Sequence, residues 1–252
     1  MRRHLLTLCL LSLGQVACNQ RDHPRTEEAD DKAVKFVENL GGTIERDDKA
    51  EGKPVIKVFL VGPHVPNAAL KELAGFKQLK ILYLNGAQVT DAGLKELVGL
   101  KQLIELDLND TQVTDAGLEE LSELKQLQTL RLSHTKVTDT GLKELAGLKL
   151  LRELDFNRTK VTDAGLKELA ELKQLQTLRL SGLELTDAGL KELAGLKQLQ
   201  NLDLYSCNVT DTGLKDLAGL KQLQTLRLGF TGVTDAGIAE LKKSLPDCKI
   251  EK

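Results

Sequence analysis

The chain has 252 residues, of which 53 are leucine, whereas tryptophan is absent and aromatic residues make up 3%. Lysine and arginine (35) nearly balance aspartate and glutamate (37), so the formal net charge is −2 and gives no reason to expect nucleic acid or an anionic membrane as a partner. Four cysteines do not make a disulfide scaffold. The dominance of one aliphatic residue indicates a small unit that is used many times.

Arg2 and Arg3 lie at the start of the chain, and an apolar run from Leu5 to Leu13 follows them. A helix needs about 20 apolar residues to span a bilayer, so this run is too short to be a transmembrane segment. A basic start, a short apolar run and a polar continuation form the layout of a secretory signal. We therefore predict that residues 1–17 are a signal peptide and that the protein is exported.

A cysteine directly follows this segment. The sequence Val-Ala-Cys that ends at Cys18 resembles the end of a bacterial lipobox, although that pattern has leucine where this chain has Gln15. The resemblance implies lipid attachment at Cys18, a tether over residues 18–27, and a membrane-anchored lipoprotein that faces the periplasm or the cell surface. Cleavage near Gly14 is the alternative, and it would give a soluble secreted or periplasmic protein.

Residues 28–53 are predicted to form an N-terminal cap. The segment from Glu28 to Leu40 has apolar residues at helical spacing and stops at Gly41-Gly42. The segments 43–46 and 55–60 can pair as two strands across a polar loop. A stack of repeated units needs such a cap, because its first unit would otherwise expose apolar surface to water.

The rest of the chain is a tandem array of one short unit. The triplet Val-Thr-Asp, with leucine for valine in one copy, begins at residues 89, 113, 137, 161, 185, 209 and 233. Every step between copies is therefore 24 residues, and no copy carries an insertion. A constant period of this length predicts a solenoid of stacked coils over residues 54–240.

The two ends of the repeat array differ from its interior. The first copy is degenerate, with Asn67 and Ala69 at the places of the aspartate and the glycine. At the other end, Ile250 lies one full repeat after Leu226, which predicts a final stub strand within a C-terminal cap over residues 241–252.

Each unit contains the signals of one strand and one helix. Two leucines separated by one residue, as at Leu106 and Leu108, predict a short strand with one buried face. Thr114 and Asp115 then supply a helix N-cap and an acid near the positive end of the helix dipole. Leucines at every third position from Leu118 onward give a short helix one apolar stripe. A helix this short is unstable alone, so its leucines are expected to be buried between neighbouring coils.

This unit is similar to that of the leucine-rich repeat family, in a short bacterial version rich in the sequence TDAGLKELAGL. The similarity covers about residues 54–252. It implies an α/β solenoid of about eight repeats plus caps, with a curved parallel sheet on the concave face and short helices on the convex face. Because such proteins usually bind partners on the concave face, the resemblance also implies a binding module.

On each predicted strand, the residues beside the buried leucines point to the concave face. The middle residues of these triplets alternate in charge at Asp107, Arg131, Asp155, Arg179, Asp203 and Arg227. Parallel strands lie about 4.8 Å apart, so we expect each charge to pair with the opposite charge on the next strand. Such a ladder either forms a polar groove for a charged ligand or keeps an exposed sheet soluble, and self-pairing favours the second interpretation.

Apolar and aromatic residues interrupt these charged rows near both ends. Aromatic side chains are rare in this chain, and exposed ones are typical anchors of interfaces. For Phe59 and Val61, contact with the N-terminal cap is the competing interpretation. The better candidates for partner binding are Phe59, Val61, Ile81 and Tyr83 near the N-terminal end and Tyr205 and Phe230 near the other end. The six residues of the charge ladder, from Asp107 to Arg227, complete the predicted partner-binding set on the concave face.

The sequence contains no catalytic or metal-binding signature. Its four histidines do not recur at metal-ligand spacing, and it has no P-loop, zinc-protease or nucleophile-elbow motif. We therefore expect no enzymatic activity, no cofactor and no metal.

Two of the cysteines lie in the repeat region. Cys207 and Cys248 are almost two coils apart, which corresponds to about 10 Å at strand spacing and exceeds the roughly 7 Å limit for a disulfide. We expect two separate thiols and no disulfide, with Cys207 half-buried in a turn.

Together these features predict a non-enzymatic, exported, monomeric leucine-rich repeat module that binds an unidentified protein or cell-envelope macromolecule. The alternative is a structural or envelope-spacing protein, whose uniform convex helices pack against copies of the chain or against cell-wall polymer. A third interpretation, an intracellular interaction scaffold, rests on the similarity of the repeat to those of F-box proteins and ribonuclease inhibitors. No F-box precedes the repeats here.

Overall fold

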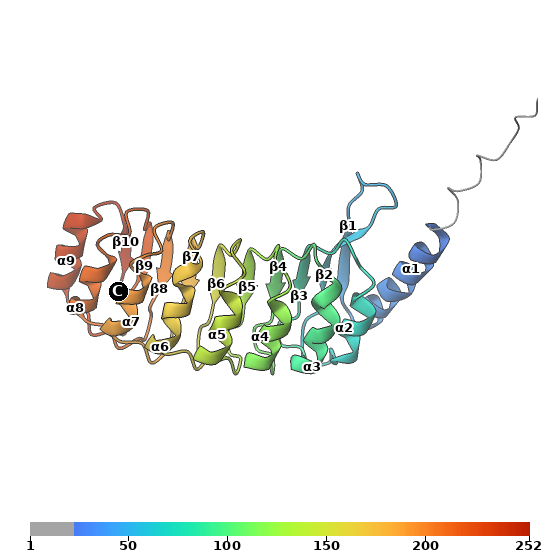
Figure 1. Cartoon of the computed structure of the whole chain (residues 1–252), viewed down its shortest axis with the longest axis horizontal. Helices are drawn as coiled ribbons and strands as arrows, with labels where there is room; N and C mark the ends of the chain where they lie inside the picture. Colours follow the sequence, from blue (N-terminus) through green and yellow to red (C-terminus); the bar gives the residue numbers. More distant parts are fainter. Residues whose placement is uncertain (1–22) are drawn as a thin grey trace, which may run out of the picture.

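The computed structural model describes residues 23–252, so the predicted signal peptide and Cys18 lie outside the described residues. Within this part of the chain, strands lie side by side in one long sheet, and helices α2–α9 form a second layer along one face of it (Figure 1). A strand and a helix alternate in every coil. This arrangement confirms the predicted α/β solenoid.

The strands pair in chain order, with β1 antiparallel to β2 and every later pair parallel. The central leucine of one strand lies opposite that of the next, as Leu130 lies opposite Leu154, and each coil repeats this register. The strands are β1 (Thr43–Arg46), β2 (Val55–Phe59), β3 (Ile81–Tyr83), β4 (Glu105–Asp107), β5 (Thr129–Arg131), β6 (Glu153–Asp155), β7 (Thr177–Arg179), β8 (Asn201–Asp203), β9 (Thr225–Arg227) and β10 (Lys249–Glu251).

The helices of the second layer are short, as the leucine stripe predicted. In two coils the α-helix continues as a 3₁₀ helix, over Lys95–Gly99 and Lys167–Glu171. The α-helices are α1 (His23–Asn39), α2 (Ala68–Leu73), α3 (Asp91–Leu94), α4 (Asp115–Leu121), α5 (Asp139–Leu145), α6 (Asp163–Leu166), α7 (Asp187–Leu193), α8 (Asp211–Leu217) and α9 (Asp235–Ser244).

Leucine builds the core between the two layers. In one coil, Leu154 on the strand, Leu166 on the helix and Leu172 in the returning loop each expose none of their surface. Burying one such side chain contributes about 2 kcal/mol. A single coil has too few of them to form a core, so the coils are stable only as a stack.

The N-terminal cap closes the first end of the stack. Helix α1 buries Ala33 and Val37 in the core, and β1 pairs with β2 across the polar loop, which confirms the predicted hairpin. The helix begins at His23 rather than at Glu28, so residues 23–27, which belong to the expected tether, are helical. Apolar periodicity detects a helix only where it buries a face, and these residues are polar.

From α4 onward each repeat helix begins with the predicted threonine cap, but the aspartate after it has a second role. The hydroxyl of Thr162 accepts a hydrogen bond from the N–H of Ala164 at 3.3 Å and so caps α6. Asp139 of the preceding coil accepts hydrogen bonds from the backbone N–H and the hydroxyl of Thr162, both at 2.7 Å. We call these contacts the Asp–Thr rungs. They join successive coils and are made by the aspartates at positions 91, 115, 139, 163, 187 and 211.

A glycine in each repeat helix makes room for the aspartate of the preceding coil. A Cβ atom at Gly141 would lie 2.5 Å from Oδ1 and 3.2 Å from Cα of Asp115. The first coil has no aspartate before it, and there Ala69 replaces the glycine. Its Asn67 donates to the Thr90 hydroxyl and accepts from the Thr90 N–H, so it still forms the rung. The degenerate copy is therefore a functional starting unit of the stack.

The last coil ends the array as the sequence predicted. Ile250 of β10 pairs with Leu226 of β9, which confirms the stub strand. Asp235 has no later coil to bind, and its carboxylate accepts a hydrogen bond from the Lys252 ammonium at 2.7 Å.

Candidate interaction surface

The sheet face opposite helices α2–α9 is the predicted concave face. Its side chains form three rows, which come from the first strand residue, the last strand residue and the second residue beyond the strand. In the coil of β4 these are Glu105, Asp107 and Asn109, all half-buried. Because the register is constant, each row runs straight along the whole solenoid.

The structure brings the predicted N-terminal group together as one patch. The rings of Phe59 and Tyr83 lie with their centroids 4.9 Å apart, and the Lys57 ammonium lies 4.4 Å from the Phe59 centroid. Thr43 of β1 is the sheet neighbour of Phe59, so the cap borders the patch on that side. Val61 exposes 46% of its surface and remains open to a partner. The N-terminal patch comprises Phe59, Val61, Ile81 and Tyr83.

Glutamates, rather than the predicted aspartates, are the close partners of the arginines. Arg131 donates from Nη1 to Glu105 at 2.5 Å and from Nε to Glu153 at 3.1 Å. Arg179 donates to the same Glu153 at 2.5 Å. The aspartates are more distant: the carboxylate of Asp107 is 3.9 Å from Arg131 and that of Asp203 is 3.9 Å from Arg227. The predicted pairing of aspartate with arginine therefore occurs in these two places, but glutamates are the closer partners.

The aspartates are held by the backbone instead. Asp107 and Asp155 each accept the N–H of the asparagine two residues later at 2.9 Å, and Asp203 accepts that of Tyr205 at 3.0 Å. A short side chain turns back to its own backbone readily, whereas the longer glutamate reaches the neighbouring strand. Burial raises the pKa of Asp107 and of Asp155.

The glutamate–arginine network matches its charges internally. Burial works to raise the pKa of Glu153, but the hydrogen bond from Arg179 and the charge of Arg131 outweigh it. The pKa of Glu153 is therefore lowered. Burial likewise works to lower the pKa of Arg131, and the two glutamates that bind it raise it instead. The middle of the concave face therefore offers little unpaired charge, which supports the solubility interpretation of the charged rows.

Tyr205 and Phe230 form a second aromatic group, which we call the C-terminal pair. Their rings meet edge to face with centroids 5.1 Å apart, and they expose 41% and 81% of their surfaces. A Cβ atom at Gly229 would lie 2.8 Å from the Tyr205 ring, so this glycine makes room for the ring. Phe230 was predicted on the concave face, but it lies in the turn after β9, on the rim of that face.

The turn position that Phe230 occupies has a left-handed backbone in every coil. Its φ is 57° at Phe230 and 53° at Arg158, and glycine occupies the equivalent position at Gly86 and Gly182. A left-handed conformation costs a residue with a Cβ atom about 1–2 kcal/mol. Phe230 is therefore held in a conformation that its side chain disfavours.

Replacing Arg158 by glycine is expected to raise the free energy of unfolding by about 1 kcal/mol, because glycine adopts this backbone without a Cβ clash. Gly182→Ala, at the same position one coil later, should lower it by a similar amount. Urea denaturation followed by circular dichroism measures both. Two changes of the same sign would contradict the strain assigned to this turn.

Cys207 and Cys248 are both free thiols. Cys207 is buried rather than half-buried, because its turn position points into the core, and its Sγ donates to the carbonyl of Leu180 in the preceding coil at 3.2 Å. Burial raises the pKa of Cys207 to about 11. The thiol is therefore protonated at neutral pH and a poor nucleophile.

The described part of the chain contains no cluster of histidine, cysteine, aspartate or glutamate side chains able to hold a metal ion. His134 lies in an exposed turn, 3.7 Å from Asp110. Among the same residues, no helix has the length and apolar character needed to cross a membrane.

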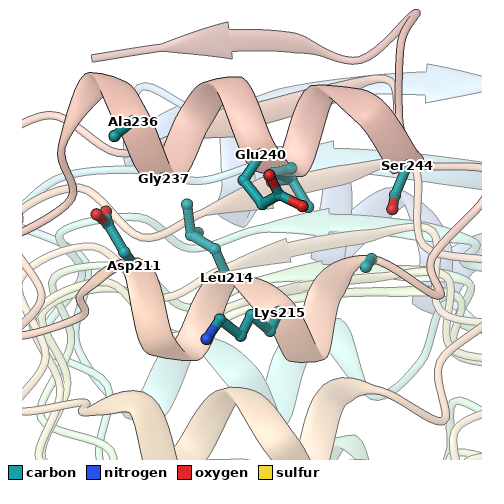
Figure 2. A pocket seen from close by; sticks show the side chains of 9 residues that line it. Asp211, Leu214, Lys215, Ala236, Gly237, Glu240 and Ser244 are labelled. Atoms are coloured by element: carbon teal, nitrogen blue, oxygen red, sulfur yellow. The ribbon is translucent and has the colours of Figure 1, made fainter.

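A groove of about 310 Å³ lies in the helix layer, between α8 and α9 (Figure 2). The apolar residues Leu214 and Leu241 line it together with Gly237, and Lys215 and Glu240 contribute charged side chains to the lining. It is on the opposite layer from the concave face. None of the residues that the sequence singled out lines it.

Comparison with known proteins decides the family. Residues 63–246 match the family described as leucine-rich repeat region, which is more than half of the chain. The chain belongs to the leucine-rich repeat family. The matched segment contains the repeat helices and the strands β3 to β9. No curated protein matches this leucine-rich repeat chain significantly.

Solved leucine-rich repeat structures share the fold. An internalin of Listeria monocytogenes aligns with a TM-score of 0.56 at 24% identity, over 73% of this chain and 56% of that one. A leucine-rich repeat protein of Leptospira interrogans aligns with a TM-score of 0.58 at 29% identity, over 72% and 51%. Internalin C2 of Listeria monocytogenes aligns with a TM-score of 0.57 at 24% identity, over 82% and 92%. The chain thus spans about half the length of the first two proteins.

Proposed function

We infer that this leucine-rich repeat protein is a non-enzymatic binding module, which uses the concave face and its rim to bind another protein. The observation that carries this inference is the C-terminal pair. Two adjacent aromatic rings are exposed there, and Phe230 is held in a left-handed backbone conformation. An exposed and strained aromatic residue weakens the fold, and such residues concentrate at functional contacts.

The C-terminal pair differs from the other coils in a concerted way. The coils one and two repeats earlier have serine and asparagine at the place of Tyr205, and the coil that follows has Gly229 beneath the tyrosine ring. Phe230 then completes the pair. Three substitutions that fit one another in near-identical repeats favour a selected surface. Membership of the leucine-rich repeat family, whose repeats serve as protein-interaction modules, supports the same function.

Site-specific photo-crosslinking tests this function. A photoreactive amino acid would replace Ser206, which is exposed on the rim beside the C-terminal pair, and Glu192, which is exposed on helix α7, in separate full-length proteins. In the native host we expect a partner protein to be crosslinked from position 206 and not from position 192. Crosslinking from position 192 instead would favour the structural or envelope-spacing role of the convex helices.

Phe230→Gly is expected to weaken binding of the crosslinked partner at least about 10-fold while it raises the free energy of unfolding by about 1 kcal/mol. The binding loss follows from removal of an aromatic anchor, and the stability gain from relief of the left-handed strain. Arg158→Gly is the matched control, since it relieves the same strain and leaves the C-terminal pair intact. Unchanged binding by Phe230→Gly would contradict the function assigned to this pair.

We also propose that the protein is exported, anchored to a membrane by lipid on Cys18, and monomeric. The support for export and anchoring is the sequence alone: two arginines, the apolar run from Leu5 to Leu13, and the lipobox-like residues before Cys18. The mass of the N-terminal peptide from the native host tests it. A lipid adduct on Cys18 would support anchoring, whereas an unmodified new terminus would indicate a soluble exported protein. An intact Met1 would overturn export.

A further inference from the structure

A row of lysines follows one long edge of the solenoid. The loops that lead from each helix into the next strand, residues 75–80 and their equivalents in every later coil up to 219–224, contain nine basic and two acidic side chains. We call this row of loops the basic edge. Its main residues are exposed lysines one repeat apart, at positions 77, 101, 125, 149, 173, 197 and 221.

Contacts within the protein use only part of this charge. Lys101, Lys197 and Lys221 each donate to a backbone carbonyl at the end of the helix in the next coil, at 3.0 to 3.4 Å. Such a bond uses one of the three N–H groups of an ammonium. Within residues 30–252, Lys101 and Lys149 are the members of the row that have an acidic partner, at 3.4 and 3.5 Å.

The lysines of the helix layer provide a contrast in the same coils. Lys143, Lys167, Lys191 and Lys215 are equally exposed and repeat with the same period, but each is followed directly by a glutamate or an aspartate. The helix row is therefore neutral over its length. The basic edge is not, although the net charge of the whole chain, −2, conceals this difference.

The arrangement of the basic edge suits a linear ligand. Coils repeat about every 5 Å at the sheet, which is less than the Debye length of about 8 Å at physiological salt, so the positive potentials of neighbouring lysines add. The one aromatic residue in these loops, Phe76, is buried. The edge therefore has no exposed aromatic side chain for stacking nucleic-acid bases and no exposed apolar side chain for insertion into a membrane.

We propose that the basic edge binds a linear anionic polysaccharide, whose phosphate, sulfate or carboxylate groups contact successive lysines. This contact is separate from the concave face and its rim. One chain can thus hold an anionic polymer along one edge while a protein partner occupies the rim beside the C-terminal pair. The inference does not depend on the proposed function.

Fluorescence anisotropy with labelled dextran sulfate, compared with uncharged dextran, tests the proposal on the protein as residues 18–252. The test variant changes four lysines of the basic edge to glutamine: Lys149, Lys173, Lys197 and Lys221. The control variant changes four lysines of the helix layer in the same coils to glutamine: Lys143, Lys167, Lys191 and Lys215. Both variants lose four positive charges. We expect the test variant to reduce the slope of log Kd against log salt by about 3, since each lost contact contributes about 0.7.

The control variant should keep the slope of the unmodified protein. Equal effects of the two variants would overturn the proposal, because binding would then follow total charge. The absence of binding to dextran sulfate at low salt would also overturn it. Tighter binding to a single-stranded DNA of equal charge, or to vesicles with anionic lipid, would overturn the class of ligand. Circular dichroism of both variants checks that a loss of binding does not arise from unfolding.

Discussion

Replacing Asp139 by alanine is expected to lower the free energy of unfolding by about 3 kcal/mol. The substitution removes the acceptor of two hydrogen bonds, from the backbone N–H and the hydroxyl of Thr162 in the next coil. A hydrogen bond to a charged group contributes about 1.5–3 kcal/mol, and a half-buried donor left without its partner adds to the loss. Urea denaturation of the full repeat array measures the change.

Asp235→Ala is the matched control. Asp235 has the same place at the start of its helix, but no coil follows it, and its side chain is 93% exposed in an ion pair with Lys252. A surface pair of this kind contributes at most about 1 kcal/mol. Equal losses in the two variants would show that the aspartates act on their own helices alone and that the Asp–Thr rungs do not hold the coils together.

Gly141→Ala should also destabilise the protein by about 2–3 kcal/mol, although alanine is the better helix former. The new Cβ would lie 2.5 Å from Oδ1, 2.9 Å from a Leu118 methyl and 3.2 Å from Cα of the preceding coil's Asp115. The Cα atom belongs to the backbone and cannot turn aside. Overpacking of this kind costs about 1–3 kcal/mol, and the displaced carboxylate also loses its bonds to Thr138.

Gly195→Ala provides the comparison, because the nearest atom to its new Cβ is the flexible end of Lys173 at 3.7 Å. The free energy of unfolding of the Gly195→Ala variant should stay within about 0.5 kcal/mol of that of the unmodified protein or rise slightly, since alanine restricts the unfolded chain. Thermal and urea denaturation compare the two variants. If both alanines were tolerated equally, close contact between coils could not explain the glycine of the repeat.

The repeat made most of the fold predictable. A constant period predicted the strand and the helix of each coil and the threonine cap of the helices from α4 onward, and the spacing from Leu226 to Ile250 predicted the stub strand. The start of α1 was missed because polar residues show no apolar period. The Asp–Thr rungs were missed because they join residues almost a full repeat apart. The joint change to Asn67 and Ala69 in the first copy was the signal that could have revealed them.

The candidate site was less predictable than the fold. Spacing identified which side chains share the concave face, but the choice of partner depends on side-chain length, so Arg131 binds glutamates and Asp107 turns to its own backbone. Phe230 was grouped correctly with Tyr205, but its left-handed backbone was missed, and the glycines at the same repeat position, Gly86 and Gly182, were the signal that could have revealed it. Burial of Cys207 follows from its turn position, where other coils place a threonine that points inward.

The Asp–Thr rungs also bear on how such a protein can change in length. Each rung uses a donor and an acceptor that every interior coil supplies, so units inserted or removed in frame would form rungs on both sides, and units exchanged in pairs would also keep the alternation of Asp107, Arg131, Asp155 and Arg179 along the sheet. The residues that depart from the rung pattern, Asn67, Ala69 and Asp235, lie in the first coil and the last. Recombination that exchanges pairs of the near-identical units would therefore produce longer or shorter arrays in a single genetic step, each about 5 Å per coil different in reach, without any compensating mutation in the interior.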